Sequence, residues 1–152
     1  MPTILHSALT TTELHEPKGA ASATANQVYV ADGAGSGAWT NRQMTFSAVI
    51  ADVSTAETVY IPMPYAGTVK KITTVLEGAI TTANATVTAK NSAASSMGTI
   101  TVAHTGSAAG DVDNLEPASN NTVTDNDYIT VETDGGSTGA QRLWVNVVVD
   151  LS

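Results

Sequence analysis

Hydrophobic and polar residues alternate one by one over two long segments of the chain, which is the pattern of a half-buried β-strand. In residues 143–151 every second position is Leu or Val, so that Leu143, Val147 and Leu151 fall on one face. Residues 43–52 repeat the pattern with aliphatic or aromatic residues at alternate positions. Both segments are therefore predicted to be strands with one face in a hydrophobic core.

Shorter Thr- and Val-rich segments lie between these two and are separated by turn residues. Residues 52–56 and 125–127 have the composition of turns, and Pro62 and Pro64 indicate an edge strand or a corner between sheets. Residues 106–121 are expected to form a long polar connection. Further strands are expected at 57–61, 68–77, 86–90, 99–104, 122–124 and 128–133. These short strands, without an amphipathic helix, predict an all-β fold: an antiparallel β-sandwich with jelly-roll-like topology over residues 41–152.

The segment 68–77 does not keep strict alternation, because Ile72, Val75 and Leu76 do not share one face of a regular strand. Either a β-bulge or a strand buried on both faces would explain this pattern. Lys70 and Lys71 lie inside the segment, and regular strand geometry would send them to opposite faces. We therefore expect Lys71 to reach a contact between subunits.

Residues 1–40 have a different character. A short apolar strand, Val28-Tyr29-Val30, lies between a run of small residues and the glycine-rich segment 33–37, and the stretch closes on Trp39. Such a composition buries too little apolar surface to offset the entropy of ordering it alone. The sequence thus predicts an extended N-terminal arm that orders on another molecule, with residues 33–37 as a flexible hinge.

Charge narrows the possible partners. The chain of 152 residues has 14 Asp and Glu against 6 Lys and Arg, a formal net charge of −8. No basic face is available for nucleic acid, and the same deficit disfavours an anionic membrane surface. Cysteine is absent, which excludes disulfides and thiolate metal sites. The N-terminus lacks the cationic start and apolar run of a secretory signal, so none is expected.

Candidate catalytic chemistry is sparse. His104 follows an apolar strand face and is expected at a core edge or an interface, without a catalytic role. No serine lies in a nucleophile-elbow motif and no phosphate-binding loop is present, so neither an enzyme nor a cofactor is indicated. Seven carboxylates lie between Asp111 and Asp134 without an intervening Lys or Arg. They fit a solvated acidic rim, or a Ca²⁺ site whose spacing matches no EF-hand.

Trp144 lies on the face of the last strand that is opposite Leu143 and Val145, together with Val148. Two interpretations remain open: the second sheet of the sandwich covers this face, or a partner does. On the second interpretation Lys71, Trp144 and Val148 belong to a subunit interface.

Several short motifs resemble the virion proteins of tailed phages. In the N-terminal part these are HEPKG, which begins at His15, and QVYVADGAGSGAW. In the C-terminal part they are VYIPMPYAGTVKKI, AAGDV, NNTVTDNDYITVETDGGSTGA and LWVNVVVDL. These motifs resemble segments of capsid decoration and head-fibre proteins. Related segments also occur in tail-fibre proteins.

The resemblance implies a structural protein that cements the head shell from outside. Its partners would be the major capsid protein and two further copies of itself in a homotrimer, and it would be made in the host cytoplasm and located on the outer surface of the virion capsid. The alternative is a head- or tail-fibre tip that binds a receptor on the host cell. The residues expected to anchor the arm to the capsid are His15, Glu16, Pro17, Lys18, Gly19, Val28, Tyr29, Val30 and Trp39.

Overall fold

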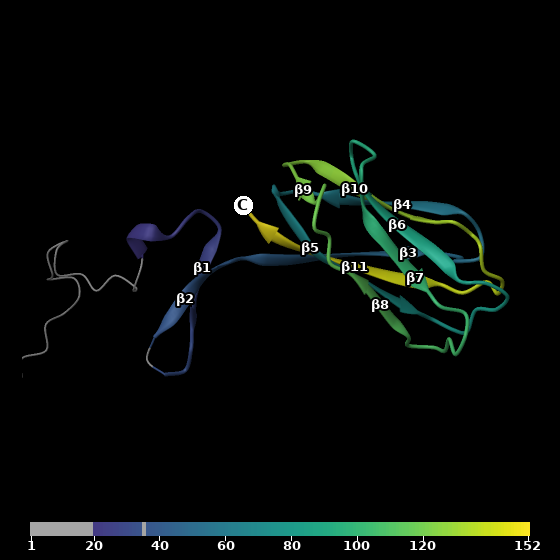
Figure 1. Cartoon of the computed structure of the whole chain (residues 1–152). Helices are drawn as coiled ribbons and strands as arrows, with labels where there is room; N and C mark the ends of the chain where they lie inside the picture. The colour runs from purple at the N-terminus through teal and green to yellow at the C-terminus, as the bar shows by residue number, and fades with distance from the viewer. Residues whose placement is uncertain (1–19, 35) are drawn as a thin grey trace, which may run out of the picture. The chain divides into compact units, whose positions relative to one another are not determined.

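The computed structural model describes residues 20–34 and 36–152. The chain divides into two compact units, Met1–Arg42 and Gln43–Ser152. Figure 1 shows the ribbon of both units. The predicted capsid-anchoring residues His15, Glu16, Pro17, Lys18 and Gly19 lie outside the described residues. Among the described residues, no helix is long and apolar enough to cross a bilayer.

The described part of the first unit is a short 3-10 helix followed by an antiparallel β-hairpin. Helix η2 covers Ala20–Ser22, strand β1 covers Gln27–Ala31 and strand β2 covers Gly37–Asn41. The predicted strand at Val28–Val30 is confirmed as part of β1. It is not solitary, because β2 pairs with it along its whole length, from Gln27↔Asn41 to Ala31↔Gly37. Strand β2 shows no alternation of apolar and polar residues, since Gly37, Ala38 and Thr40 are small or polar.

The second unit is an all-β, antiparallel sandwich, as predicted. One sheet has the order β3-β11-β5-β8, with the short β9 also paired to β5, and the other has the order β4-β10-β6-β7. The first and last strands of the sandwich are neighbours, and consecutive strands such as β3 and β4 lie in different sheets, which is a jelly-roll arrangement. The strands are β3 Gln43–Ile50, β4 Glu57–Met63, β5 Gly67–Leu76, β6 Ala85–Asn91, β7 Ser96–Val102, β8 Val112–Leu115, β9 Thr122–Val123, β10 Asp127–Thr133 and β11 Leu143–Leu151.

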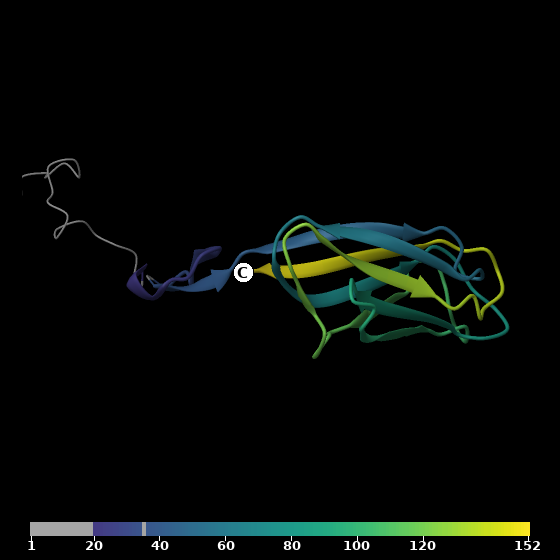
Figure 2. The same ribbon diagram turned by 90° about the horizontal axis from the view of Figure 1, so that it is seen from above.

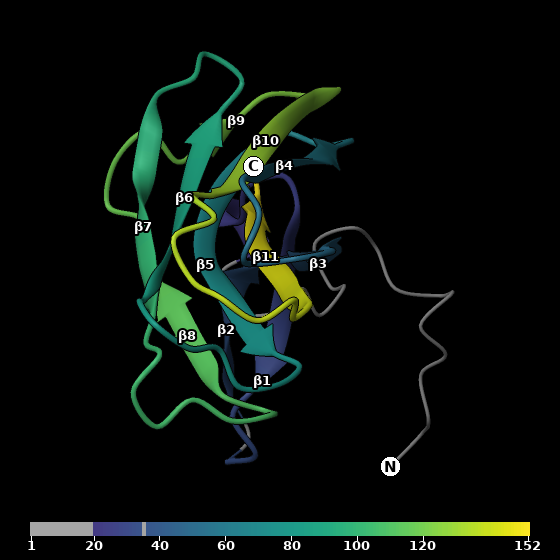
Figure 3. The same cartoon turned by 90° about the vertical axis from the view of Figure 1, so that its right-hand side faces the viewer.

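Strand β11 organises the first sheet. It pairs with β3 on one side and with β5 on the other, and Figure 2 shows it running beside β3 to the C-terminus. The face predicted to be apolar points into the core, where Leu143, Val145, Val147 and Val149 are fully buried. Viewed end-on, β7 and β8 close one side of the sandwich, and β3 and β4 close the other (Figure 3).

Two local expectations need correction. The connection 106–121 contains strand β8, whose sequence Val-Asp-Asn-Leu carries no clear period and which exists because it pairs with the edge of β5. Strand β4 runs through Pro62 to Met63 rather than stopping at Ile61. A proline is tolerated there because β4 is an edge strand, which has no neighbouring strand on one side to accept a backbone hydrogen bond.

Candidate interaction surfaces

The hairpin of the N-terminal unit has two different faces. Tyr29 and Trp39 are cross-strand partners, with ring centroids 5.4 Å apart and an interplanar angle of 64°, an edge-to-face contact. On the opposite face Val28 and Val30 are 42% and 51% exposed. The structure thus joins Tyr29 and Trp39 to each other. It leaves the two valines as the aliphatic side chains available for an outside contact.

Asp32, Ala34 and Ser36 are hydrogen-bonded to one another between β1 and β2, and the interpretation of residues 33–37 as a flexible hinge stays a prediction. The Asp32 amide donates to the Ser36 carbonyl at 2.9 Å. The Asp32 carboxylate accepts hydrogen bonds from the amides of Ala34 and Ser36, at 2.8 and 3.0 Å. These two amide bonds lower the pKa of Asp32. An Asp side chain that accepts hydrogen bonds from the amides of the following residues stabilises a turn.

Trp144 lies on the outer face of the sandwich and is 47% exposed. The interpretation that the second sheet covers this face is therefore wrong, because that sheet packs against the opposite face of β11. Val148 and Lys71 are half-buried on the same outer face and are direct cross-strand partners. The structure thus brings Val148 and Lys71 together, and places Trp144 four residues back along β11.

Trp144 belongs to an apolar row that the sequence did not reveal. Its cross-strand partners are Val49 on β3 and Val75 on β5, and Val75 in turn pairs with Val112 on β8. Val112 is 57% exposed. We call Val49, Trp144, Val75 and Val112 the apolar row. The sequence alone does not identify this row, because only the register between the strands shows that its four residues lie side by side.

The predicted irregularity in β5 is a β-bulge. Val148 pairs with Lys71 whereas Val149 pairs with Val69, so that Lys70 is the extra residue. The expectation that Lys70 and Lys71 point to opposite faces is wrong. The bulge keeps both out of the core, while Val69 and Ile72 on either side are fully buried. Bulges re-aim side chains in this way at many functional surfaces.

The carboxylates between Asp111 and Asp134 are dispersed over several elements. Within the described ranges, no group of three or more His, Asp or Glu is placed so that it could hold a metal ion. Asp134 accepts hydrogen bonds from the amides of Thr86 and Gly136. Asp113 sits on the inner side of edge strand β8, where partial burial, and secondly the charge of Asp111, raises its pKa. Asp134 thus stabilises a turn, and Asp113 lies at a sheet edge.

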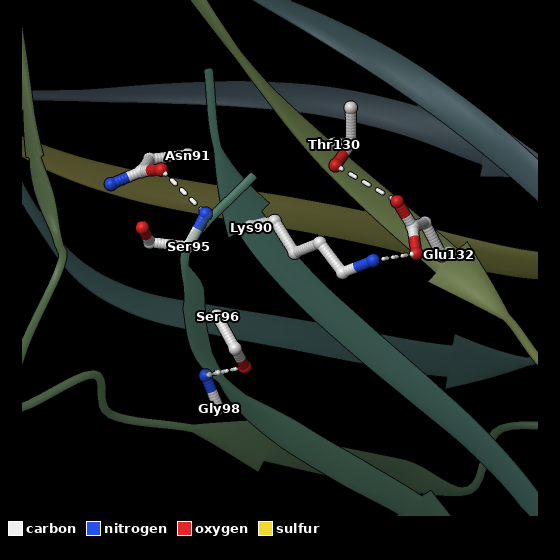
Figure 4. A network of polar contacts seen from close by, with 7 residues as sticks. All are labelled: Lys90, Asn91, Ser95, Ser96, Gly98, Thr130 and Glu132. Atoms are coloured by element: carbon white, nitrogen blue, oxygen red, sulfur yellow. Dashed lines mark hydrogen bonds and ion pairs between the residues drawn. The ribbon is translucent and has the colours of Figure 1, made fainter. Parts of the chain in front are cut away.

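The outer face of the other sheet carries a second aromatic pair. Tyr60 on β4 and Tyr128 on β10 have ring centroids 5.5 Å apart, with 57° between the planes, and are 67% and 40% exposed. Beside them Lys90 pairs with Glu132, which also accepts a hydrogen bond from Thr130 at 3.4 Å (Figure 4). Sequence reasoning missed this pair, because Tyr60 and Tyr128 lie 68 positions apart and meet only through the β4–β10 register.

His104 lies in the loop after β7. Its Nδ1 is 2.8 Å from Asn84 Oδ1, which also accepts the His104 amide at 3.0 Å. These contacts connect the loop after β7 to Asn84. On the described surface of the protein, no enclosed pocket is found.

The fold and these surfaces define a jelly-roll β-sandwich with a separate N-terminal hairpin unit. No protein-family model matches the chain, and no curated protein matches it. Among solved structures it is similar to a chain of the "Cyanophage Pam1 capsid asymmetric unit", with a TM-score of 0.49 and 12% sequence identity. The match covers 74% of this chain and 87% of that chain. A likeness of this degree carries no assignment of function.

Proposed function

We propose that the protein is a capsid decoration protein of a tailed phage, which binds the outer surface of the head shell through its N-terminal arm. The observation that carries this proposal is the compact N-terminal unit with its exposed Val28 and Val30. Such a hairpin can insert an aliphatic face into a neighbouring protein while the jelly roll projects outward. The motif resemblance to decoration proteins agrees with a structural role.

The copies form a homotrimer in this proposal, and the major capsid protein is the partner. A head shell offers three-fold and quasi-three-fold positions, and a symmetric oligomer matches a symmetric site. Three linked arms then act together, so that a modest affinity of each arm gives durable attachment. Lys71, Trp144 and Val148 are the residues assigned to the contact between copies.

Co-sedimentation with head shells stripped of the native protein tests the attachment. We expect the full chain to bind and Val30→Asp to bind at least about tenfold more weakly, because a charge replaces an apolar contact. Thr99→Asp places the same charge on the outer face of β7 and serves as the matched control, which should bind like the unmodified chain. Equal binding by the Val30 variant would reject attachment through the hairpin.

A second candidate function is a fibre tip that binds a host-cell receptor, and the Tyr60–Tyr128 pair is the observation that favours it. Exposed aromatic rings beside a hydroxyl, an ammonium and a carboxylate can stack on and hydrogen-bond a neutral saccharide. Tyr60→Ala and Tyr128→Ala should then reduce the adsorption of phage to host cells without changing shell binding. Unchanged adsorption would remove this candidate.

A further inference from the structure

The apolar row crosses the outer face of the β3-β11-β5-β8 sheet as a bounded stripe. Neighbouring strands lie about 4.8 Å apart, so the four residues span roughly 14 Å. The adjacent row along the strands is polar, and there Ser47 Oγ donates to Asn146 Oδ1 at 2.6 Å. An uncharged stripe of one indole and three valines, with Trp144 and Val112 about half exposed, is the composition of an interface centre.

Two lysines on the same face lack a described partner. Within residues 43–152, Lys90 pairs with Glu132 and Arg142 lies 3.8 Å from Glu77. Lys70 and Lys71 form no ion pair with a described carboxylate, although this unit holds 11 of the 14 Asp and Glu and four of the six Lys and Arg. Asp150 lies on this face too, two residues beyond Val148, and its Oδ1 accepts from Gln43 Nε2 at 2.8 Å.

We infer that copies of this chain meet through this face, around a three-fold axis parallel to β11, with their apolar rows closing into one layer. The inference rests on the proposed homotrimer and gives it a contact surface. A rotation about such an axis keeps each residue at its height along the strands. Because each copy turns this face toward the axis, the half of the face that contains β5 and β8 meets the half of the next copy that contains β3 and β11. Trp144 then faces Val75, Val112 meets Val49, and the Lys70–Lys71 bulge comes opposite Asp150.

Charge complementarity identifies a second copy as the occupant. Residues 43–152 carry a net charge of −7 from the counts above, so two copies repel each other except where their contact is uncharged or complementary. This face meets both requirements. The apolar row is uncharged, and further along the strands Lys70 and Lys71 of one copy come opposite Asp150 of the next. The Tyr60 face differs, because its lysine and glutamate already neutralise each other within one copy.

The mass of the full chain in solution, measured by light scattering on a size-exclusion column, tests the inference. The unmodified chain should have the mass of a trimer. Lys70→Glu and Asp150→Lys should each weaken assembly at least about tenfold, and the two together should restore it, because the reversed pair attracts again. Thr99→Asp, on the other sheet, should leave the mass unchanged. Circular dichroism verifies the fold of each variant.

Val112→Asp provides an independent test of the row. The side chain is exposed on a four-residue edge strand, so the charge is compatible with the fold and should yield a monomer. A monomeric unmodified chain overturns the inference, and so does a charge reversal that is without effect or not restored in the double variant. The measurement contains no head shells. A trimer that fails to bind shells rejects attachment to the head shell and leaves this inference standing. A monomer that binds shells rejects this inference together with the proposed homotrimer, and leaves attachment through the arm standing.

Discussion

Val147 and Val30 carry the same side chain in opposite environments. Val147 is fully buried on β11 between the two sheets, whereas Val30 is 51% exposed on the hairpin. Truncating a buried valine loses transfer free energy and leaves a cavity, so Val147→Ala should lower the free energy of unfolding by about 2–3 kcal/mol. Val30→Ala is the matched control and should change it by less than about 0.5 kcal/mol. Denaturant titration measures both. Equal losses would contradict the assigned burial.

Asp113 and Asp52 are expected to affect stability with opposite signs. Partial burial, and secondly the Asp111 charge, raises the pKa of Asp113 above the ordinary 3.8. The hydrogen bond from the Ser54 hydroxyl, and secondly that from the Ser54 amide, lowers the pKa of Asp52. A raised carboxyl pKa means that the charged form is disfavoured in the folded state, so the penalty is present above the folded pKa and vanishes below the unfolded value.

Asp113→Asn should therefore raise the melting temperature at about pH 7, and the gain should disappear at about pH 3. Asp52→Asn should lower it at neutral pH, and this loss should fade as the pH falls through the folded pKa, because the protonated carboxyl no longer holds the Ser54 bonds. Thermal melts followed by circular dichroism across this range give the comparison. A gain from Asp113→Asn that persists in acid would show that its cause is not ionisation.

At the scale of the elements, alternation predicted those strands that have one face in the core. The strongest case is β11, where every second residue is apolar, and its inward face was predicted residue by residue. Strands β2 and β8 were missed, because their residues are small or polar and their pairing partners lie elsewhere in the chain. The apolar row was missed for the same reason. Membership in a row depends on register between strands, which a single sequence does not contain.

The bulge in β5 allows an element-scale prediction. Removing Lys70 would leave Val69 inward and Lys71 outward in direct succession, so alternation and pairing with β11 would be preserved. Deletion of Lys70 should therefore give a cooperatively folded protein. Deletion of Thr73 in the same strand should not, because a one-residue slip moves buried residues to the wrong face. Circular dichroism and thermal melting distinguish the two. A folded Thr73 deletion, or an unfolded Lys70 deletion, would contradict the register described above.

At the scale of the whole molecule, the division into Met1–Arg42 and Gln43–Ser152 predicts independent folding of the sandwich. Residues 43–152 expressed alone should show an all-β spectrum and melt within about 5 °C of the full chain, since the core of the sandwich is made from its own strands. The shortened protein should not bind stripped shells. If it failed to fold, the N-terminal unit would be part of the sandwich core. If it bound shells like the full chain, attachment would lie in the jelly roll.

The location of the protein in the virion tests the central claim most directly. Cryo-electron microscopy of a virion that contains this protein, reconstructed with and without symmetry, resolves the head surface and the tail. The decoration proposal predicts density of the jelly roll on the outside of the head, in groups of three, with the hairpin buried against the shell protein. Density confined to the tail or to a fibre, with a bare head surface, would contradict the proposal.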